Sequence, residues 1–347
     1  MTLHQQLAGV LIGTAVGDAL GLPAEGLSRR RIQRKWKGIW KHRFLFGYGK
    51  CSDDTEHTFF VAQALLSCGD DPAAFQRSLA WKLRFWLLGL PAGVGFATLR
   101  SIIKLWMGFP PSRSGVFSAG NGPAMRSAII GAYFADQPEK RRLFVSISTK
   151  MTHTDPKAET AALAVAEAAA WAVNQNEPVE AWLGRLQEFG RDEEWLSICQ
   201  RVVEFYGERK SVQEFADALG LGKGVSGYAY HSVPVALYAF IRHTYDFRSA
   251  VVAALDCGGD TDTVGAIVGA LCGARLGVAN IPNQWCERVW EWPRSFTLLA
   301  EAAERLAEQK HSQSPLGPIR YFWPAVVLRN IIFTVTVLIH GSARLLP

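Results

Sequence analysis

Two stretches far apart in the chain carry a glycine at every fourth residue, and this spacing constrains the fold more than any other feature. Residues four apart lie on one face of an α-helix, so each stretch predicts a helix with a ridge of bare backbone. A glycine inside a helix costs roughly 1 kcal/mol relative to alanine, so four of them make sense only where another helix packs very closely. The two sets are Gly9, Gly13, Gly17 and Gly21, and Gly265, Gly269, Gly273 and Gly277.

We expect these two ridges to meet where the helices cross in the core. The crossing would bring Asp18 and Glu25, near the end of the first helix, close to Asp260 and Asp262, at the start of the second. For the glycines alone, the alternative is a pair of ordinary, tightly packed helices with no functional site. A transmembrane pair is not favoured, because each apolar run is shorter than the roughly 20 residues that a span requires.

The second glycine stretch is preceded by a cluster of oxygen-bearing side chains. Asp260, Thr261, Asp262 and Thr263 follow Gly258 and Gly259. The glycines allow a tight turn with positive φ that gathers these oxygens. Such a cluster suits a hard divalent cation, magnesium or manganese, better than zinc.

A second acidic cluster, Ser52-Asp53-Asp54, comes directly before an apolar segment that begins at Thr58. Serine and aspartate are typical helix N-cap residues, and capping is the simplest interpretation of this cluster by itself. Capping needs only one such residue, however, and three stand here in a row. Together with Asp260 and Asp262, the cluster predicts metal ligands.

Two further segments are candidates for binding a ligand. Gly120, Asn121 and Gly122 precede Pro123, which suits the first position of a helix over 123–134, and N–H groups at such a junction can bind an anion. By itself this motif is more often a simple turn. His153 lies just before Asp155, a natural N-cap, and a histidine there is more often structural than a ligand contact.

The remaining pattern is mainly helical, with no alternation of strands and helices, so we predict one all-α domain over residues 1–311. Residues 312–347 form a short linker and an apolar tail. Within the tail, Arg329 and His340 bracket about ten residues, too few to span a bilayer. We expect a helix that packs on the body or on a second subunit; peripheral membrane contact is the less favoured alternative.

The net charge of +6 is local, because Arg29 to Arg43 contains eight Lys or Arg and no acid. We expect an irregular loop here, which either meets a phosphate-bearing substrate or an acidic partner or is simply solvated. Nucleic-acid binding is not expected. Six cysteines without any CxxC pairing, and no signal peptide at Met1, favour a reduced, cytoplasmic protein.

The motifs together resemble the ADP-ribosylglycohydrolase family, including its dinitrogenase reductase-activating members, over about residues 5–280. The resemblance implies a single compact orthogonal helical domain with a dinuclear metal cleft that holds two Mg²⁺ or Mn²⁺ ions. The motifs that carry it, in the order of the family, are Gly17-Asp18-Ala19-Leu20-Gly21 with Glu25, Ser52-Asp53-Asp54-Thr55, Gly120-Asn121-Gly122-Pro123-Ala124-Met125-Arg126, Thr152-His153 and Gly258-Gly259-Asp260-Thr261-Asp262-Thr263.

The resemblance also implies a role for each of these residues. Ser52, Asp53 and Asp54 would hold one ion, Asp260 and Thr263 the other, and Asp262 would bridge them. Glu25 matches the catalytic glutamate of the family, and Asp54 and Asp262 complete the expected catalytic set. The residues that would contact ADP-ribose are Gly120, Asn121, Gly122 and His153.

The activity implied is hydrolysis of the C1″ glycosidic bond of an ADP-ribosylated protein or of a small ADP-ribose derivative, with release of ADP-ribose. The alternatives are a non-catalytic ADP-ribose binder or immunity-type protein on the same scaffold, and a dinuclear-metal phosphohydrolase. In the family, the segment between the first metal motif and Gly120 contributes to the acceptor side of the cleft. Here that segment offers apolar residues such as Phe96, and no Asp or Glu occurs between Asp71 and Asp136. Because a carboxylate usually holds a guanidinium group, we expect arginine-linked ADP-ribose not to be the best substrate. The sequence predicts no particular oligomeric state.

Overall fold

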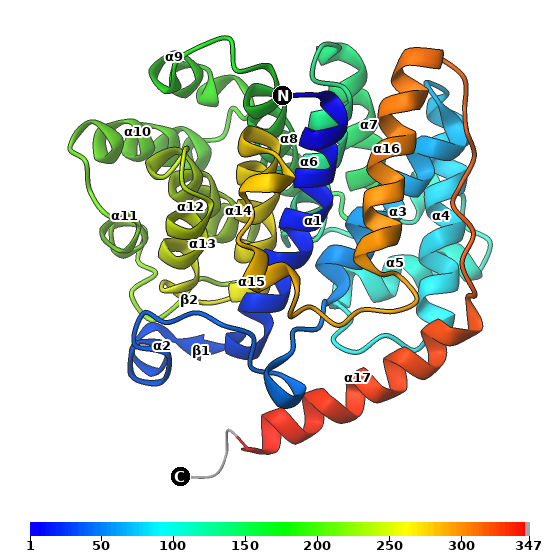
Figure 1. Ribbon diagram of the computed structural model, residues 1–347. Helices are drawn as coiled ribbons and strands as arrows, with labels where there is room; N and C mark the ends of the chain where they lie inside the picture. Colours follow the sequence, from blue (N-terminus) through cyan, green and yellow to red (C-terminus); the bar gives the residue numbers. More distant parts are fainter. Residues whose placement is uncertain (344–347) are drawn as a thin grey trace.

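The computed structural model describes residues 1–343 and is built almost entirely from helices (Figure 1). The all-α prediction is confirmed; residues 344–347, the end of the predicted tail, lie outside the described residues. The helices are α1 (Leu3–Gly21), α2 (Arg29–Trp36), α3 (Asp53–Cys68), α4 (Pro72–Leu88), α5 (Phe96–Trp106), α6 (Ala128–Tyr133), α7 (Pro138–Lys150), α8 (Pro156–Asn174), α9 (Val179–Gly184), α10 (Glu193–Gly207), α11 (Val212–Ala218), α12 (Ala229–Arg242), α13 (Phe247–Leu255), α14 (Thr261–Leu276), α15 (Asn283–Cys286), α16 (Phe296–Ser312) and α17 (Pro324–Ala343), and the two short strands are β1 (Leu27–Ser28) and β2 (Gly258–Gly259).

Helices α1 and α14 pack directly against each other through their glycines, as the spacing predicts. A Cβ atom built on Gly9, Gly13 or Gly17 would lie only 2.1, 2.2 or 1.9 Å from the carbonyl oxygen of Gly273, Gly269 or Gly265, respectively. The pairing order shows that the helices run antiparallel along their whole contact instead of meeting at one crossing point. Gly277 is the exception, because it ends the second helix and lies against Met1.

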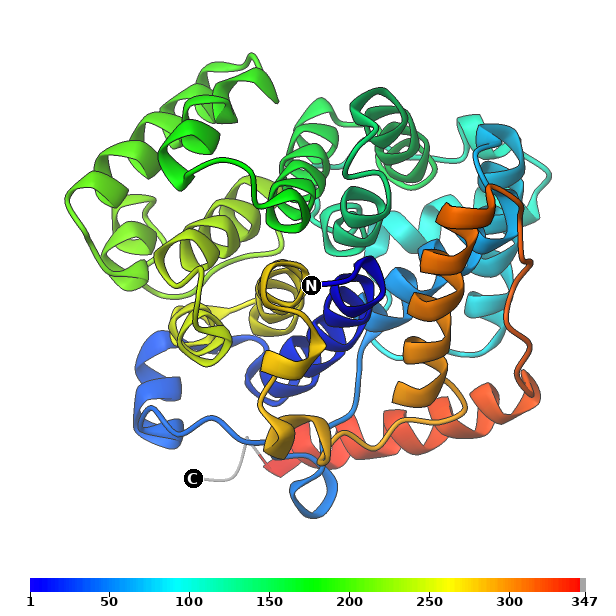
Figure 2. The same cartoon turned by 45° about the horizontal axis from the view of Figure 1, so that its top comes forward.

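The other helices enclose this central pair. Helices α3, α6 and α16 contact α1, whereas α8, α12 and α13 contact α14. Figure 2 shows both central helices surrounded by the rest of the chain. Every residue of α1 from Gln6 onward is buried, which explains why this helix has no polar face.

The basic segment differs from its predicted structure. Arg29–Trp36 is a helix, α2, and not part of an irregular loop. Its residues are mostly good helix formers and include no Gly or Pro, and the helix ends where Lys37 and Gly38 adopt positive φ. The many charged residues of this segment led to the prediction of a loop, because the helix buries only two side chains, Ile32 and Trp36.

The predicted helix over 123–134 is also divided. A 3₁₀ turn occupies Ala124–Arg126, and only Ala128–Tyr133 is α-helical. Arg126 lies fully buried in this turn. Its guanidinium donates to the side chains of Ser148 and Thr152 and to the carbonyl oxygen of Ser148, and these contacts hold the segment to α7 and the residues after it.

The tail forms one long helix, α17, after a linker, which agrees with the expected helix. The expectation that both apolar runs are too short to span a bilayer is wrong by length and composition, because two helical segments within the described residues are long and apolar enough: Leu3–Ala24 and Pro324–Ser342. The first is entirely buried in the core, whereas only 28% of the second is buried. The first segment is therefore a core helix, and the second lies along the outside of the body (Figures 1 and 2).

Candidate active site

The end of α1 and the start of α14 meet because the two helices are antiparallel. A Cβ on Gly21 would lie 2.2 Å from the carbonyl oxygen of Thr261, and the Thr261 hydroxyl donates a 2.8 Å hydrogen bond to the carbonyl oxygen of Gly21. The chain therefore places Glu25, just beyond α1, beside Asp260 and Asp262. The proximity expected from the glycine ridges is present.

The turn that precedes α14 is held by its glycines. Gly258 and Gly259 have φ values of 72° and 84° and pair with Ser28 and Leu27 in the small sheet. A Cβ on Gly259 would lie 1.9 Å from the carbonyl oxygen of Val225, so only glycine allows this approach. The Val225 carbonyl also accepts a hydrogen bond from the backbone N–H of Asp260, which fixes the start of the acidic cluster.

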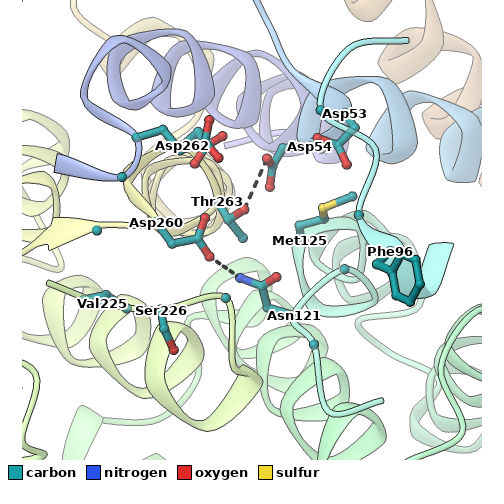
Figure 3. A pocket seen from close by; sticks show the side chains of 18 of the residues that line it. Asp53, Asp54, Phe96, Asn121, Met125, Val225, Ser226, Asp260, Asp262 and Thr263 are labelled. Atoms are coloured by element: carbon teal, nitrogen blue, oxygen red, sulfur yellow. Dashed lines mark hydrogen bonds between the residues drawn. The ribbon is translucent and has the colours of Figure 1, made fainter. Parts of the chain in front are cut away.

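The acidic residues line one cleft with a volume of about 740 Å³ (Figure 3). Asp53 and Asp54 lie on one wall, and Asp260, Asp262 and Thr263 lie opposite. Of the predicted site residues, Ser52 alone does not line the cleft; it is buried behind Asp54. The predicted residues that do line it are Glu25, Asp53, Asp54, Gly120, Asn121, Gly122, His153, Asp260, Asp262 and Thr263.

Hydrogen bonds connect the acidic clusters to each other and to the glycine-rich loop. Asp54 Oδ2 accepts from Ser52 Oγ at 2.9 Å and from Thr263 Oγ1 at 3.3 Å. Asn121 Nδ2 donates to Asp260 Oδ2 at 2.6 Å. Three segments far apart in the sequence therefore share one polar network (Figure 3).

Two carboxylate oxygens in the cleft lack a partner among residues 1–343. Oδ1 of Asp54 and Oδ1 of Asp262 are buried, and neither has a hydrogen-bond partner in this part of the chain. Burial raises the pKa of both carboxyl groups well above the usual value. At Asp54, repulsion by the carboxylates of Asp18, Asp53 and Asp260 raises the pKa further. At Asp262, repulsion by those of Glu25, Asp260 and Asp54 has the same effect. An orphaned buried acceptor is costly, and a bound cation would satisfy both oxygens.

The chemistry of the donors therefore fits a hard divalent cation. Carboxylates and hydroxyls are the ligands that magnesium and manganese prefer. Within residues 1–343, no three His, Cys, Asp or Glu side chains are gathered tightly enough to form a metal site by themselves. Other oxygen atoms, such as the hydroxyl oxygen of Thr263, would therefore be needed to complete the set of metal ligands.

Asp18 supports the site from beneath, in a role that the sequence analysis did not assign. Its carboxylate is fully buried and accepts from the N–H of Ser52, at 2.9 and 3.0 Å, and from the N–H and hydroxyl of Thr55, at 3.2 and 2.5 Å. Burial raises its pKa to about 7 despite these donors. Asp18 thus fastens the start of α3 to α1. An acidic residue inside an otherwise apolar helix was a signal of a buried polar role, but it did not indicate which segment Asp18 would hold.

The loop of Gly120 to Gly122 packs on the His153 ring. Cβ atoms on Gly120 and Gly122 would lie 3.1 and 3.2 Å from ring atoms of His153. Burial, followed by the charge of Arg126, lowers the pKa of His153 to about 3, so the ring is neutral near neutral pH. The N–H of Gly120 donates to Ser118 Oγ, and that of Asn121 to the carbonyl oxygen of Gly227. These two groups are therefore engaged within the protein and do not form an open anion cradle.

The sequence model of the ADP-ribosylglycohydrolase family matches residues 1–315. The chain belongs to this family. An Archaeoglobus fulgidus protein without an assigned function is 31% identical over 88% of this chain and 97% of its own length. The ADP-ribosyl-[dinitrogen reductase] glycohydrolase of Rhodospirillum rubrum is 27% identical over 83% of this chain and 91% of its own. A solved structure, described as an ADP-ribosylglycohydrolase-related protein complex, superposes with a TM-score of 0.65 at 27% identity, and covers 89% of this chain and 99% of that one.

Membership makes this ADP-ribosylglycohydrolase a glycosidase-type hydrolase that acts on ADP-ribosylated substrates. The family is known to use divalent metal ions, which agrees with the orphaned oxygens of Asp54 and Asp262. The matched region ends at residue 315, so α17 is an addition to the part that defines the family.

One wall of the cleft of this ADP-ribosylglycohydrolase was not predicted from the sequence. Lys223 to Gly227 form this wall, and the glycines at 222, 224 and 227 were a usable signal for a tight loop. Phe96, at the start of α5, projects at the rim and is 73% exposed. It belongs to the acid-free segment that was expected on the acceptor side.

Proposed function

We propose that this ADP-ribosylglycohydrolase cleaves the C1″ glycosidic bond of ADP-ribose conjugates and depends on two divalent cations, Mg²⁺ or Mn²⁺. The observation that carries the proposal is the pair of buried, unpartnered oxygens, Oδ1 of Asp54 and Oδ1 of Asp262, in the same cleft. Burial and the neighbouring carboxylates raise the pKa of each of these carboxyl groups, so positive charge in the cleft would favour their ionised forms.

The metal ligands proposed are those that the family resemblance implies. One ion would be held by Ser52, Asp53 and Asp54. The other ion would be held by Asp260 and Thr263, and both ions would be contacted by Asp262. When bound, divalent ions supply positive charge that offsets the carboxylates and polarises oxygen atoms of the substrate. The links from Asp54 to Ser52 and Thr263 support a shared site.

Glu25 is the proposed catalytic residue. It lines the cleft and is exposed to solvent, while nearby Asp262 is buried. Cleavage at C1″ develops oxocarbenium-like positive charge, which a carboxylate can stabilise, and the attacking water must lose a proton, which a carboxylate can accept. Glu25 has the chemistry for both steps.

Asn121 is the proposed orienting residue on the substrate side. Its amide nitrogen donates to Asp260 Oδ2 and, at 3.1 Å, to Ser232 Oγ, so the side-chain oxygen is held in one direction. Gly120 and Gly122 keep that wall free of side chains, which leaves space for ADP-ribose over the neutral His153 ring.

The proposed substrates are ADP-ribosylated proteins or small ADP-ribose derivatives, in line with the relative named for dinitrogen reductase. The acceptor side is formed partly by Gly93, Gly95, Phe96 and Thr98, from a segment without any acid. This supports a preference for a neutral or anionic leaving group over the arginine guanidinium.

A panel of arginine-, serine- and acyl-linked ADP-ribose, with product analysis, tests the proposal. We expect release of ADP-ribose that stops with a chelator and returns with Mg²⁺ or Mn²⁺, and faster cleavage of the serine or acyl linkage than of arginine. Release of AMP would identify a phosphohydrolase, and binding without any product would identify a non-catalytic binder. Metal-independent release of ADP-ribose would refute the metal requirement alone.

We also propose that the protein works in the cytoplasm. Its six cysteines are all free thiols, which suits a reducing compartment. Cell fractionation with an assay for the oxidation state of the thiols tests this placement; recovery in an oxidising compartment would contradict it.

A further inference from the structure

The outward face of α17 is apolar from Leu328 to Ile339. Its exposed residues recur at helical spacing, and each is 49–64% exposed to solvent: Leu328, Ile331, Val335, Leu338 and Ile339. Helix α17 lies along one edge of the molecule with this face uncovered (Figures 1 and 2). A continuous apolar stripe of this kind marks an interaction surface.

The opposite face of α17 is fastened to the body by polar contacts. Arg329 is buried and forms a two-pronged ion pair with Glu291, and it also donates to the carbonyl oxygen of Cys51. Asn330 donates to the carbonyl oxygen of Gly89 at 2.7 Å. Leaving these contacts would expose a buried ion pair, so α17 remains docked and its outward stripe remains outward. A helix docked in this way can lie on a bilayer but cannot cross it.

Aromatic side chains extend the stripe at both ends. Near the start of α17, Phe322, Trp81 and Phe85 are 72%, 53% and 46% exposed, and Phe85 lies 6.0 Å, ring to ring, from Trp323. At the other end, Phe44 packs on His340 at 4.8 Å, and nearby in sequence Phe46 is 91% exposed. The rings of Trp81 and Trp323 are amphipathic and are favoured at the level of lipid headgroups, whereas the Phe rings add apolar area.

The two segments that carry the stripe and the neighbouring basic residues contain charge of one sign only. Helix α2 and the residues after it adjoin the end of α17, since Lys35, Arg43 and His340 line one hollow. No Asp or Glu occurs in residues 26–52 or after Glu308. Arg29 is paired with Asp217, whereas the exposed residues of this segment include Arg30, Arg31, Arg34, Lys35 and Lys37.

We propose that the outer face of α17 and the basic residues of α2 together bind an anionic lipid bilayer, with α17 lying in the headgroup region. The apolar face of α17 would insert into the headgroup region, and the basic residues of α2 would be attracted to the acidic headgroups. This combination is typical of a helix that lies at a membrane interface. The sequence alone made this the less favoured alternative. The positive charge beside the stripe, with no acid in either segment, favours an anionic surface over the same basic face of a second copy.

Vesicle flotation of the full chain tests the proposal. We expect binding to vesicles of equal parts phosphatidylcholine and phosphatidylglycerol, little binding to phosphatidylcholine alone, and weakening by salt. Replacing Leu328, Ile331 and Val335 by Gln should lower the partition coefficient by roughly tenfold for each side chain replaced. Replacing Arg30, Arg31 and Lys35 by Gln should lower it by roughly fivefold for each.

Two matched variants control for surface polarity and charge. Leu143, Leu196 and Val203 are exposed apolar residues on α7 and α10, and Arg191 and Arg209 are exposed basic residues elsewhere; their replacement by Gln should leave flotation unchanged. The α17 variant should keep its melting temperature and its hydrolysis of a soluble substrate. The proposal fails if wild type does not float, if both α17 and control variants float as wild type does, or if the α17 variant only converts a dimer to a monomer.

Discussion

Helices α1 and α17 have nearly the same length, 19 and 20 residues, and both are apolar enough to pass for membrane spans. One is buried in the core from Gln6 onward and the other lies on the outside of the protein. The difference is in surface shape. Helix α1 presents a glycine ridge on which another backbone can rest, whereas α17 presents bulky branched side chains outward and is held to the body through Arg329 and Asn330. Hydropathy alone therefore does not predict where a helix is placed.

The largest expected effect concerns the chemistry placed beyond the end of α1. Glu25→Gln removes the carboxylate and nearly preserves its shape, so we expect kcat to fall by roughly 10²–10⁴-fold, the usual contribution of a general acid–base group. ADP-ribose binding and metal content, measured by calorimetry and elemental analysis, should be retained. Leu328→Gln on α17 is the matched control, with unchanged kcat. Loss of binding with hydrolysis preserved would make Glu25 a binding residue instead.

The attachment of α17 is tested by Arg329→Met. Removing one partner of a buried ion pair costs about 3–5 kcal/mol, because the other charge is left unpaired, and Glu291 is the charge left here. We expect this loss of unfolding free energy in denaturant titration, or early proteolysis within α17 if the helix detaches alone. Arg320→Met, at an exposed position, should change stability by less than about 0.5 kcal/mol. Equal behaviour of the two variants would show that α17 is held by its apolar contacts only.

The packing of α1 is tested by Gly13→Ala. The new Cβ would lie 2.2 Å from the carbonyl oxygen of Gly269, and both backbones would have to separate. We expect the free energy of unfolding to fall by an amount at the upper end of the roughly 1–3 kcal/mol that overpacking costs. We also expect the hydrolytic activity to be reduced. Gly207→Ala is the control, since a Cβ there meets nothing within 4 Å. If Gly13→Ala melts at the same temperature as wild type, the contact between α1 and α14 is looser than described.

A smaller effect concerns pH. Burial raises the pKa of Asp18 to about 7 and that of Asp53 to about 8 from an ordinary 3.8. Between about pH 4 and pH 7–8 the folded metal-free protein holds protons that the unfolded chain has lost, so its stability falls as pH rises through this window. Metal binding displaces such protons. The affinity of the protein for the metal ion should therefore rise by up to about tenfold per pH unit for each proton released.

Thermal melts with and without Mn²⁺ at pH 6 and pH 8 measure this linkage. The stabilisation by Mn²⁺ should be greater at pH 8, and calorimetry in buffers of different ionisation enthalpy should detect proton release at pH 7. Asp53→Asn should reduce both signals. If Mn²⁺ raised the melting temperature equally at both pH values, and no proton release were detected, the link between the raised pKa values and the metal site would be contradicted.

The sequence predicted those features that follow from local rules. The glycine spacing predicted the contact of α1 with α14, and the two acidic clusters, joined by that contact, indicated the cleft. The helical structure of Arg29–Trp36 was not predicted, because its charge suggested a loop while its helix-forming residues were overlooked. The part played by Asp18, and the wall formed by Lys223 to Gly227, depend on which segments meet in space, and no local pattern records that.

The antiparallel contact of α1 with α14 also limits how the length of the chain can vary. Each residue advances an α-helix by about 100°, so one inserted residue in either helix would turn the glycines beyond it out of the contact and set a side chain against a carbonyl oxygen. The same insertion would rotate Asp18 or the Asp260–Thr263 cluster away from the cleft. Insertions and deletions should therefore be confined to loops and to the ends of the chain, and α17, after the family match ends at residue 315, is an extension of that permitted kind.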